Sequence, residues 1–176
     1  NIRTNTNATF LQNINVGVAI TAGKLGIGFT DAQIKIGNTA LDSLTTGTEN
    51  TAVGNAALTA NTTGSQNTAV GANSLDANTT GSENTAVGRG SLTKNTTGDN
   101  NVAVGRNALE DNTTGSNNTA VGGDAMIDNI ADDNTAVGRS ALRTNTTGAS
   151  NTAVGSLALD ANTTASNNTA IGYDSL

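Results

Sequence analysis

A short pattern of small apolar and polar residues recurs along most of the chain. The sequence Asn-Thr-Ala-Val-Gly, or a close variant, begins at eight positions that are seventeen residues apart, once sixteen: Asn50, Asn67, Asn84, Asn101, Asn118, Asn134, Asn151 and Asn168. A degenerate ninth copy precedes them, with Ile36-Gly37 in the place of Val53-Gly54. Because each unit can bury its apolar residues only against its neighbours, this short period predicts a solenoid.

The residues within each repeat favour strands over helices, since they are rich in Thr, Asn, Val and Gly. Asn-Gly and Asp-Gly, the strongest signals for a two-residue hairpin, never occur. We therefore predict an all-β fold, a parallel β-solenoid of about nine 17-residue coils over residues 33–176. Each strand should pair in register with its own copy one coil later.

The repeat can be read as columns, each made of the residues at one position in successive coils. The column of Val53 is Val or Ile in every coil, so we expect it to point into the core, with the Thr51 column on the same face. The intervening Ala column should then face outward, and its small size suggests close approach of another copy around an oligomer axis. The predicted oligomer interface comprises Ala52, Ala69, Ala86, Ala103, Ala120, Ala136, Ala153 and Ala170.

The second half of each repeat supplies a corner, an apolar residue and a return turn. Gly54 and its copies suit a corner with a positive φ angle, and the Leu58 column should close the second side of the core. The segment Asn61-Thr62-Thr63-Gly64 reads as the return turn. It also matches the N-glycosylation sequon, but glycans on successive coils would collide, so we expect an amide ladder of identical Asn residues instead.

One coil departs from the pattern. It reads Gly122-Gly123-Asp124-Ala125-Met126 and is one residue short, which we interpret as loss of the turn glycine. Its four acidic residues are weak candidates for a cation site, but their spacing matches neither an EF-hand nor a glycine-rich calcium repeat. A solvated acidic turn is the preferred interpretation of Asp124, Asp128, Asp132 and Asp133.

Residues 1–32 lack the repeat and are rich in candidate strand residues, at 10–11, 16–20 and 25–29. We interpret them as a β-rich cap over the first coil, or alternatively as a strand donated to a neighbouring subunit. The chain begins at Asn1 and ends within a repeat at Leu176. We therefore expect a processed chain or a piece of a longer protein.

Composition narrows the possible chemistry. The 176 residues include no His and no Cys, so there is no ordinary general base near neutral pH, no Ser-His or Cys-His pair and no soft metal site. We expect no enzyme and no cofactor. The net charge of −6 and eight scattered basic residues disfavour a nucleic-acid surface, and no segment is long and apolar enough to insert into a membrane.

The motif Asn101-Val102-Ala103-Val104-Gly105, with the following Ala-Leu and Asn-Thr-Thr-Gly elements, resembles the head repeats of trimeric autotransporter adhesins (YadA-type) and related repeats of phage tail fibres. The resemblance covers residues 33–176. It implies a left-handed parallel β-roll in each chain, three rolls about a common axis, and a location outside the cell, at a cell or virion surface. The period of seventeen is longer than the adhesin repeat, and no coiled-coil stalk or membrane anchor is visible.

Three functions are compatible with these patterns. The first is a structural or adhesive extracellular fibre segment that presents a repetitive surface to glycans or host polymers, with Arg89, Arg106, Arg139 and Tyr173 as exposed contacts on one edge. The second is a filament subunit joined end to end through residues 1–32 and the last coil. The third is ice binding through Thr ladders such as the Thr62 column. In the first two, the partner is another copy of the chain, as a homotrimer or a filament.

Overall fold

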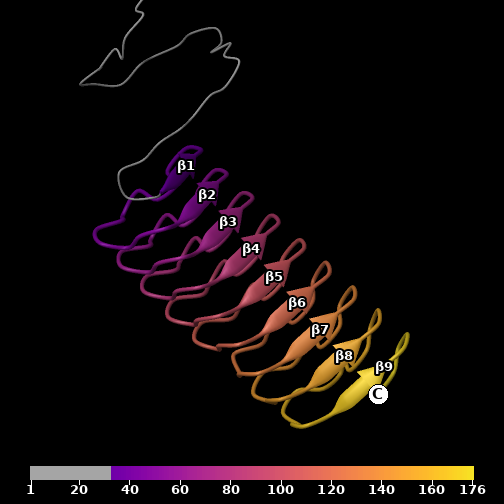
Figure 1. The fold of residues 1–176 in the computed structure, drawn as a ribbon. Helices are drawn as coiled ribbons and strands as arrows, with labels where there is room; N and C mark the ends of the chain where they lie inside the picture. The colour runs from indigo at the N-terminus through magenta and orange to yellow at the C-terminus, as the bar shows by residue number, and fades with distance from the viewer. Residues whose placement is uncertain (1–32) are drawn as a thin grey trace, which may run out of the picture.

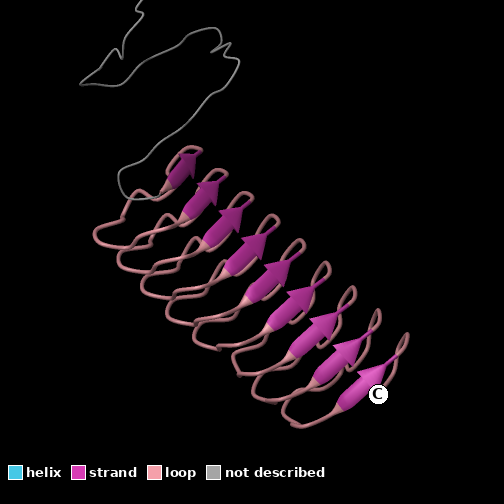
Figure 2. Ribbon diagram, viewed as in Figure 1, coloured by secondary structure: helices cyan, strands magenta, loops and turns pink. Residues whose placement is uncertain are grey.

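The fold is a parallel β-solenoid with one short strand in each coil. The computed structural model describes residues 33–176, and the expected cap at 1–32 lies outside the described residues. Nine strands stack in sequence order in a single sheet, as Figures 1 and 2 show, and every neighbouring pair is parallel. The predicted all-β solenoid is therefore confirmed. The strands are β1 (Ile34–Ile36), β2 (Thr51–Val53), β3 (Thr68–Val70), β4 (Thr85–Val87), β5 (Val102–Val104), β6 (Thr119–Val121), β7 (Thr135–Val137), β8 (Thr152–Val154) and β9 (Thr169–Ile171).

Pairing between coils is in register along the whole repeat, as the sequence predicts. In the sheet, Ala52 pairs with Ala69 and Val53 with Val70, and the shorter coil keeps the alignment, with Ala120 opposite Ala136. Backbone bonds also join the non-strand parts of successive coils; the N–H of Leu58 donates to the carbonyl of Ser74 at 3.0 Å. The turns thus take part in the same axial ladder, which satisfies backbone groups that an isolated coil would leave unpaired.

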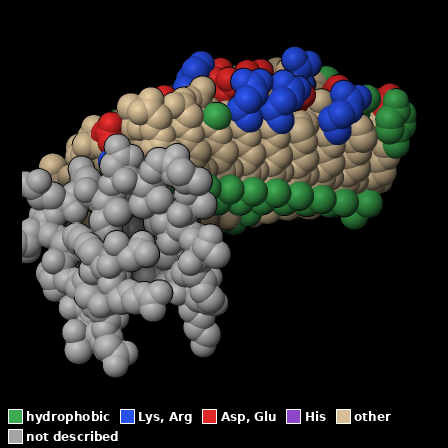
Figure 3. Space-filling model, turned by 90° about the horizontal axis from the view of Figure 1, so that it is seen from above, with side chains coloured by type: hydrophobic (Ala, Val, Ile, Leu, Met, Phe, Trp, Pro, Cys, Tyr) green, Lys and Arg blue, Asp and Glu red, His purple; other side chains and the backbone are tan. Residues whose placement is uncertain are grey.

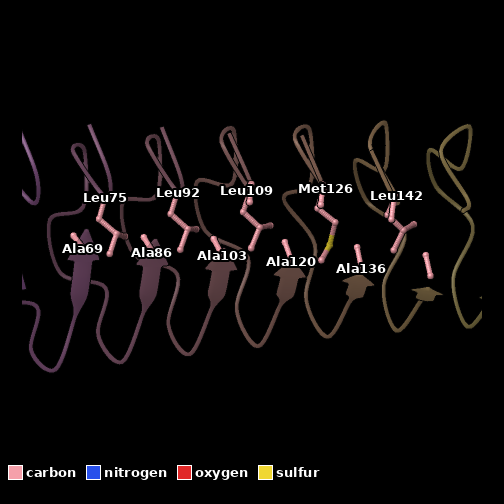
Figure 4. Packing of buried hydrophobic residues seen from close by; sticks show 14 of the residues in the cluster. Ala69, Leu75, Ala86, Leu92, Ala103, Leu109, Ala120, Met126, Ala136 and Leu142 are labelled. Carbon is pink, nitrogen blue, oxygen red and sulfur yellow. The ribbon is translucent and has the colours of Figure 1, made fainter. Parts of the chain in front are cut away.

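The core is built from the Ala column of the sheet and the Leu column opposite it. Figure 4 shows Ala69 and Leu75, and their copies along the axis, pointing toward one another across the interior. Ala52, Ala69, Ala86, Ala103, Ala120, Ala136 and Ala153 are each 0% exposed, as are the leucines from Leu58 to Leu142 and Met126 in their column. The predicted outward direction of the Ala column is therefore wrong, whereas the inward direction of the Leu column is confirmed.

The side chains that face outward belong to the Thr and Val columns. Val70, Val87 and Val104 are 36–37% exposed, and Thr68, Thr85 and Val102, two positions earlier, are half-buried. Alternation along the strand was correct, but its phase was reversed. The physical reason is that Asn50 and its copies as far as Asn151, immediately before β2 to β8, are fully buried. Since Asn50 and Ala52 share one face of the strand, Ala occupies a narrow interior that leaves little room for Val in addition to Leu.

Two buried columns of asparagine run the length of the core beside the alanines and leucines. In the first, the Oδ1 of each Asn accepts a hydrogen bond from the backbone N–H of the next, as from Asn67 to Asn50 at 3.0 Å. In the second, the side-chain amide of Asn78 donates to the Oδ1 of Asn61 at 2.9 Å. This second column is the amide ladder expected from the sequence. Both columns also donate from Nδ2 to turn carbonyls, such as Gly64.

The first described coil terminates both asparagine columns. Gln33 takes the place of Asn, and its longer side chain accepts a hydrogen bond from the N–H of Asn50 through Oε1 at 3.0 Å. Leu44 takes the place of Asn61 in the second column and packs, partly buried, against the core. A buried polar column needs a terminus that leaves no amide unpaired, and these two substitutions provide it.

The corner glycines allow the coils to stack closely. Gly88 has a φ of +138°, and a Cβ added to it would lie 2.4 Å from the carbonyl oxygen of Gly105 in the next coil. No side chain fits at that distance, which explains why this column is Gly in every coil. The leucines that fill the core also adopt positive φ, such as Leu109 at 53°, a conformation that costs a branched residue roughly 1–2 kcal/mol and is held by inter-coil bonds.

The shortened coil has lost a threonine of the return turn and not its glycine. The carbonyl of Ala131 accepts hydrogen bonds from the side chains of Asn118 and Asn129, a role that Gly115 has in the coil before. Ala131 therefore occupies the glycine position, and Ile130 alone replaces the two threonines. The turn glycine is therefore replaced by Ala131, and the deleted position is that of a threonine and not of the glycine. The deletion breaks the second asparagine column, since the buried Oδ1 of Asn112 has no hydrogen-bond partner.

Candidate functional site: an uncharged Thr/Val face

The most distinctive surface of the described residues is the outer face of the sheet. We define the Thr/Val face as the two outward columns of the nine strands, which contain Thr, Val and Ile and no charged residue. Figure 3 shows a straight row of hydrophobic side chains along one side of the molecule, with Lys, Arg, Asp and Glu gathered on the opposite side. The members of the face are Ile34, Ile36, Thr51, Val53, Thr68, Val70, Thr85, Val87, Val102, Val104, Thr119, Val121, Thr135, Val137, Thr152, Val154, Thr169 and Ile171.

The exposed large hydrophobic residues concentrate on this face. Of the twelve within residues 33–176, only Ile130, Tyr173 and Leu176 lie elsewhere. The Thr hydroxyls of the face donate no hydrogen bond to another residue of the described region, in contrast to the turn threonines. In-register pairing sets the two columns at about 4.8 Å between coils and about 7 Å across the strand. The face is therefore a regular lattice of methyl groups and available hydroxyls.

The alanines proposed for the oligomer interface cannot contact a partner. Ala52, Ala69, Ala86, Ala103, Ala120, Ala136 and Ala153 are completely enclosed by their own chain, and Ala170 is 5% exposed. A column of small residues marks a narrow interior as readily as a close approach between subunits, and here the enclosed alanines meet the leucines. Any contact with another copy at the sheet must therefore involve the Thr/Val face.

The predicted surface contacts share one column beside the sheet. Arg89, Arg106, Arg139 and Tyr173 each follow the corner glycine of their coil, and all four are exposed. The guanidinium of Arg106 forms an ion pair with Asp124 of the next coil at 2.6 Å. At half-exposed pairs of this kind, the ion pair contributes little to stability, so Arg106 remains available to a ligand.

The four acidic residues of the shortened coil do not gather into one cluster. Asp124 pairs with Arg106, while Oδ1 of Asp132 accepts a hydrogen bond from the backbone N–H of Ser116 at 2.7 Å. Within residues 33–176, no three His, Cys, Asp or Glu side chains come together in a way that suits a metal ion. The acidic turn interpretation agrees with this arrangement.

The hydroxyls of the Thr62 column, the predicted ice-binding ladder, are engaged within the solenoid. The hydroxyls of Thr62, Thr79 and Thr96 each donate to the backbone carbonyl of the next Thr in the column, at 2.9–3.0 Å. Their donor hydrogens are thus already used within the solenoid. These hydroxyls reinforce the turn, and ice binding through this column is not supported.

Other surfaces of the described residues are less distinctive than the Thr/Val face. An open hollow of about 430 Å³ lies beside the first coil and is lined by Gln33 and by residues 44–48. No helix long and apolar enough to cross a membrane occurs between residues 33 and 176.

The Lys94 ammonium donates to Asp111 of the next coil, and this hydrogen bond raises the pKa of the lysine above its usual 10.5. Both side chains are well exposed to solvent, so this pair adds little to the coil contacts.

Comparison with known proteins adds no relative. A scan of protein-family models, a search of curated proteins and a search of solved structures each found no match to this chain. The resemblance to adhesin head repeats therefore rests on the motifs of the sequence and stays a prediction.

The sequence reasoning missed the Thr/Val face because it assigned Val to the core on hydrophobicity alone. Two signals in the sequence pointed the other way. The Ala column is invariant in eight coils, and the Asn two positions before it is equally invariant. Two uniform columns separated by one residue share a face, and only a tightly constrained interior requires both. The Lys35 that replaces Ala in the first coil is exposed, and it pairs with Asp42 at 2.6 Å.

Proposed function

We propose that residues 33–176 form a stiff segment of an extracellular structural or adhesive fibre. The observation that carries the proposal is the axial continuity of the solenoid: all nine coils pair their strands in register, and the coils from Asn50 to Leu159 repeat the alanine-leucine core and the first asparagine column. Each added coil extends the structure by about 4.8 Å without changing its cross-section. Length is thereby set by the number of repeats, as a fibre or spacer requires.

The interior of the solenoid supports this role. Buried Asn side chains bond both along the axis and to the turns, as Asn67 does to the backbone of the next Asn and to Gly81. Fully satisfied buried polar networks rigidify a core and fix a unique arrangement. A rod with such a core resists bending and sliding of its coils better than one held by aliphatic contacts alone.

The fibre proposal is tested by changing the number of coils. One additional copy of the four-coil segment 50–117, inserted after residue 117, should lengthen the particle by about 19 Å at constant width. Small-angle X-ray scattering and negative-stain electron microscopy measure both dimensions. A flexible Gly/Ser insertion of equal residue number serves as the matched control, since it should add no rigid length. A duplicated chain that widens or bends instead would refute the proposal.

The adhesive part of the proposal rests on the exposed arginine column. Beads carrying the full chain should be retained on glycan-coated surfaces, and the triple variant Arg89→Gln, Arg106→Gln, Arg139→Gln should lose that retention. Arg143→Gln is the matched control, because Arg143 is exposed but belongs to another column. Equal retention of the triple variant and the parent would exclude these arginines as the contact surface.

A further inference from the structure

We propose that the Thr/Val face is covered by the same face of a second copy of this chain, so that solenoids associate side by side. This inference builds on the proposed fibre role, because it names the partner of the fibre segment. It also places the contact on residues other than the alanines that the sequence suggested. The Thr/Val face is exposed, uncharged and periodic, and these three properties suit a second copy of the chain.

The Thr/Val face exposes enough apolar surface to favour its burial against a partner. Val87, Val121 and Val137 are each 37% exposed, and they continue the same row as Val104 and Val154. The face measures about 38 Å along nine strands and on the order of 10 Å across, or about 400 Å² in plan. Apolar patches of this size on a single chain are often binding sites.

The charge and the period of the Thr/Val face favour a second copy of the chain as its partner. Neither outward column contains a charge, so two copies can meet without burying an unpaired ion. The face is also nearly uniform, with Val102 as the one Val in the column of Thr85 and Thr119. A uniform face is complementary only to a surface of the same period. A second copy has that period by construction, and its unbonded Thr hydroxyls can pair with those opposite.

The area of the Thr/Val face indicates that the association between two copies is weak. A standard stable interface buries about 800 Å² on each partner, roughly twice the plan area of this face. The contact must therefore extend to flanking columns or involve more than one neighbour. We expect a reversible association that grows with concentration.

The inference is tested by cross-linking, since the chain has no native cysteine. Val104 lies on β5, the middle strand of nine, so copies that meet face to face with their centres aligned bring the two Val104 side chains together near the middle of the contact. Under mild oxidation of the full chain, Val104→Cys should form disulfide-linked dimers at least about tenfold faster than Thr97→Cys. Thr97 is the matched control because it is exposed on a turn of the preceding coil. Equal rates would overturn the inference.

A charge introduced on the face provides the second measurement. The double variant Val87→Lys, Val104→Lys should sediment as a monomer at concentrations where the parent associates, whereas Thr80→Lys, Thr97→Lys should associate like the parent. Circular dichroism confirms that each variant is folded. A parent chain that is monomeric at all concentrations would overturn the inference. If such a monomer shapes growing ice crystals and the Val87→Lys, Val104→Lys double variant does not, the Thr/Val face binds ice and not a second copy.

These outcomes are separate from those of the fibre test. Straight particles that lengthen with added coils but never cross-link would refute the side-by-side contact alone. Particles that bend or widen would refute the stiff fibre, even if the Val104→Cys chains cross-linked.

Discussion

Asn78 donates a hydrogen bond from its side-chain amide to the Oδ1 of Asn61, one coil earlier, at 2.9 Å, and both side chains are completely buried. Asn78 also donates to the carbonyl of Gly81 in its own turn, and its Oδ1 accepts from Asn95 at 2.8 Å. A single amide therefore joins three coils and closes a turn. The buried amides add hydrogen bonds that fix the register of successive coils. A core of Ala and Leu alone would contain few apolar contacts and would lack these bonds.

Asn78→Ala should destabilise the solenoid by about 3 kcal/mol, because it leaves the buried Oδ1 of Asn61 unpaired and removes one bond each from Gly81 and Asn95. Urea unfolding measures the change. Hydrogen exchange of amides in the neighbouring coils should show the loss locally, since repeat proteins respond coil by coil. Thr80→Ala, at an exposed position of the same turn, should change stability by less than about 0.5 kcal/mol. A neutral Asn78→Ala would contradict the ladder.

Restoring the missing residue should stabilise the chain. Replacing Ile130 by Thr-Thr returns the coil to seventeen residues and brings the amide of Asn129 toward the unpaired Oδ1 of Asn112. We expect a gain of about 1–2 kcal/mol from satisfying that atom. Thermal unfolding of the full chain measures the gain. One extra Thr inserted after Thr96, in a regular coil, should lower stability instead; if both insertions behaved alike, the deletion would not be the cause.

Ala103→Val should cost about 1–3 kcal/mol, because two extra methyl groups enter a core in which Ala103 is fully enclosed. The neighbouring change Val104→Thr, on the outer face, should cost less than about 0.5 kcal/mol in the single chain. Urea unfolding at low protein concentration, where copies do not associate, makes the comparison. The reverse order of effects would restore the original assignment, with Val inside and Ala outside.

Gly88→Ala should be among the most damaging single changes. Its Cβ would lie 2.4 Å from the carbonyl oxygen of Gly105, and its φ of +138° is unfavourable for any residue with a side chain. We expect a loss above about 3 kcal/mol, with coils near the corner exchanging amide hydrogens rapidly.

The control for Gly88→Ala is Gly123→Ala, in another coil. A Cβ at Gly123 meets nothing within 4 Å, so this change should be neutral or stabilise by up to about 1 kcal/mol. A loss at Gly123 equal to that at Gly88 would show that glycine is required for flexibility of the chain and not for the close stacking of coils.

The sequence by itself determined the architecture. A period of seventeen, repeated from Gln33 onward in segments rich in Thr, Asn, Val and Gly and without Asn-Gly or Asp-Gly turns, is compatible with one parallel strand per coil and in-register stacking. It also predicted the corner at Gly54, the inward Leu column and the amide ladder at Asn61. These features depend on one residue type recurring at one position, so each coil supplies independent evidence for them.

The tertiary structure alone decided which side of the strand faces the interior. Alternation says that Thr51 and Val53 share one face and Ala52 lies on the other, but it does not say which face is buried. Hydrophobicity favours Val inside, whereas the width left between the strand and the Leu column accommodates Ala. The Asn50 column occupies the same interior as Ala52, and its complete burial is visible only when the coil is closed. The Thr/Val face, the occupied hydroxyls of the Thr62 column and the true site of the deletion all follow from that closure.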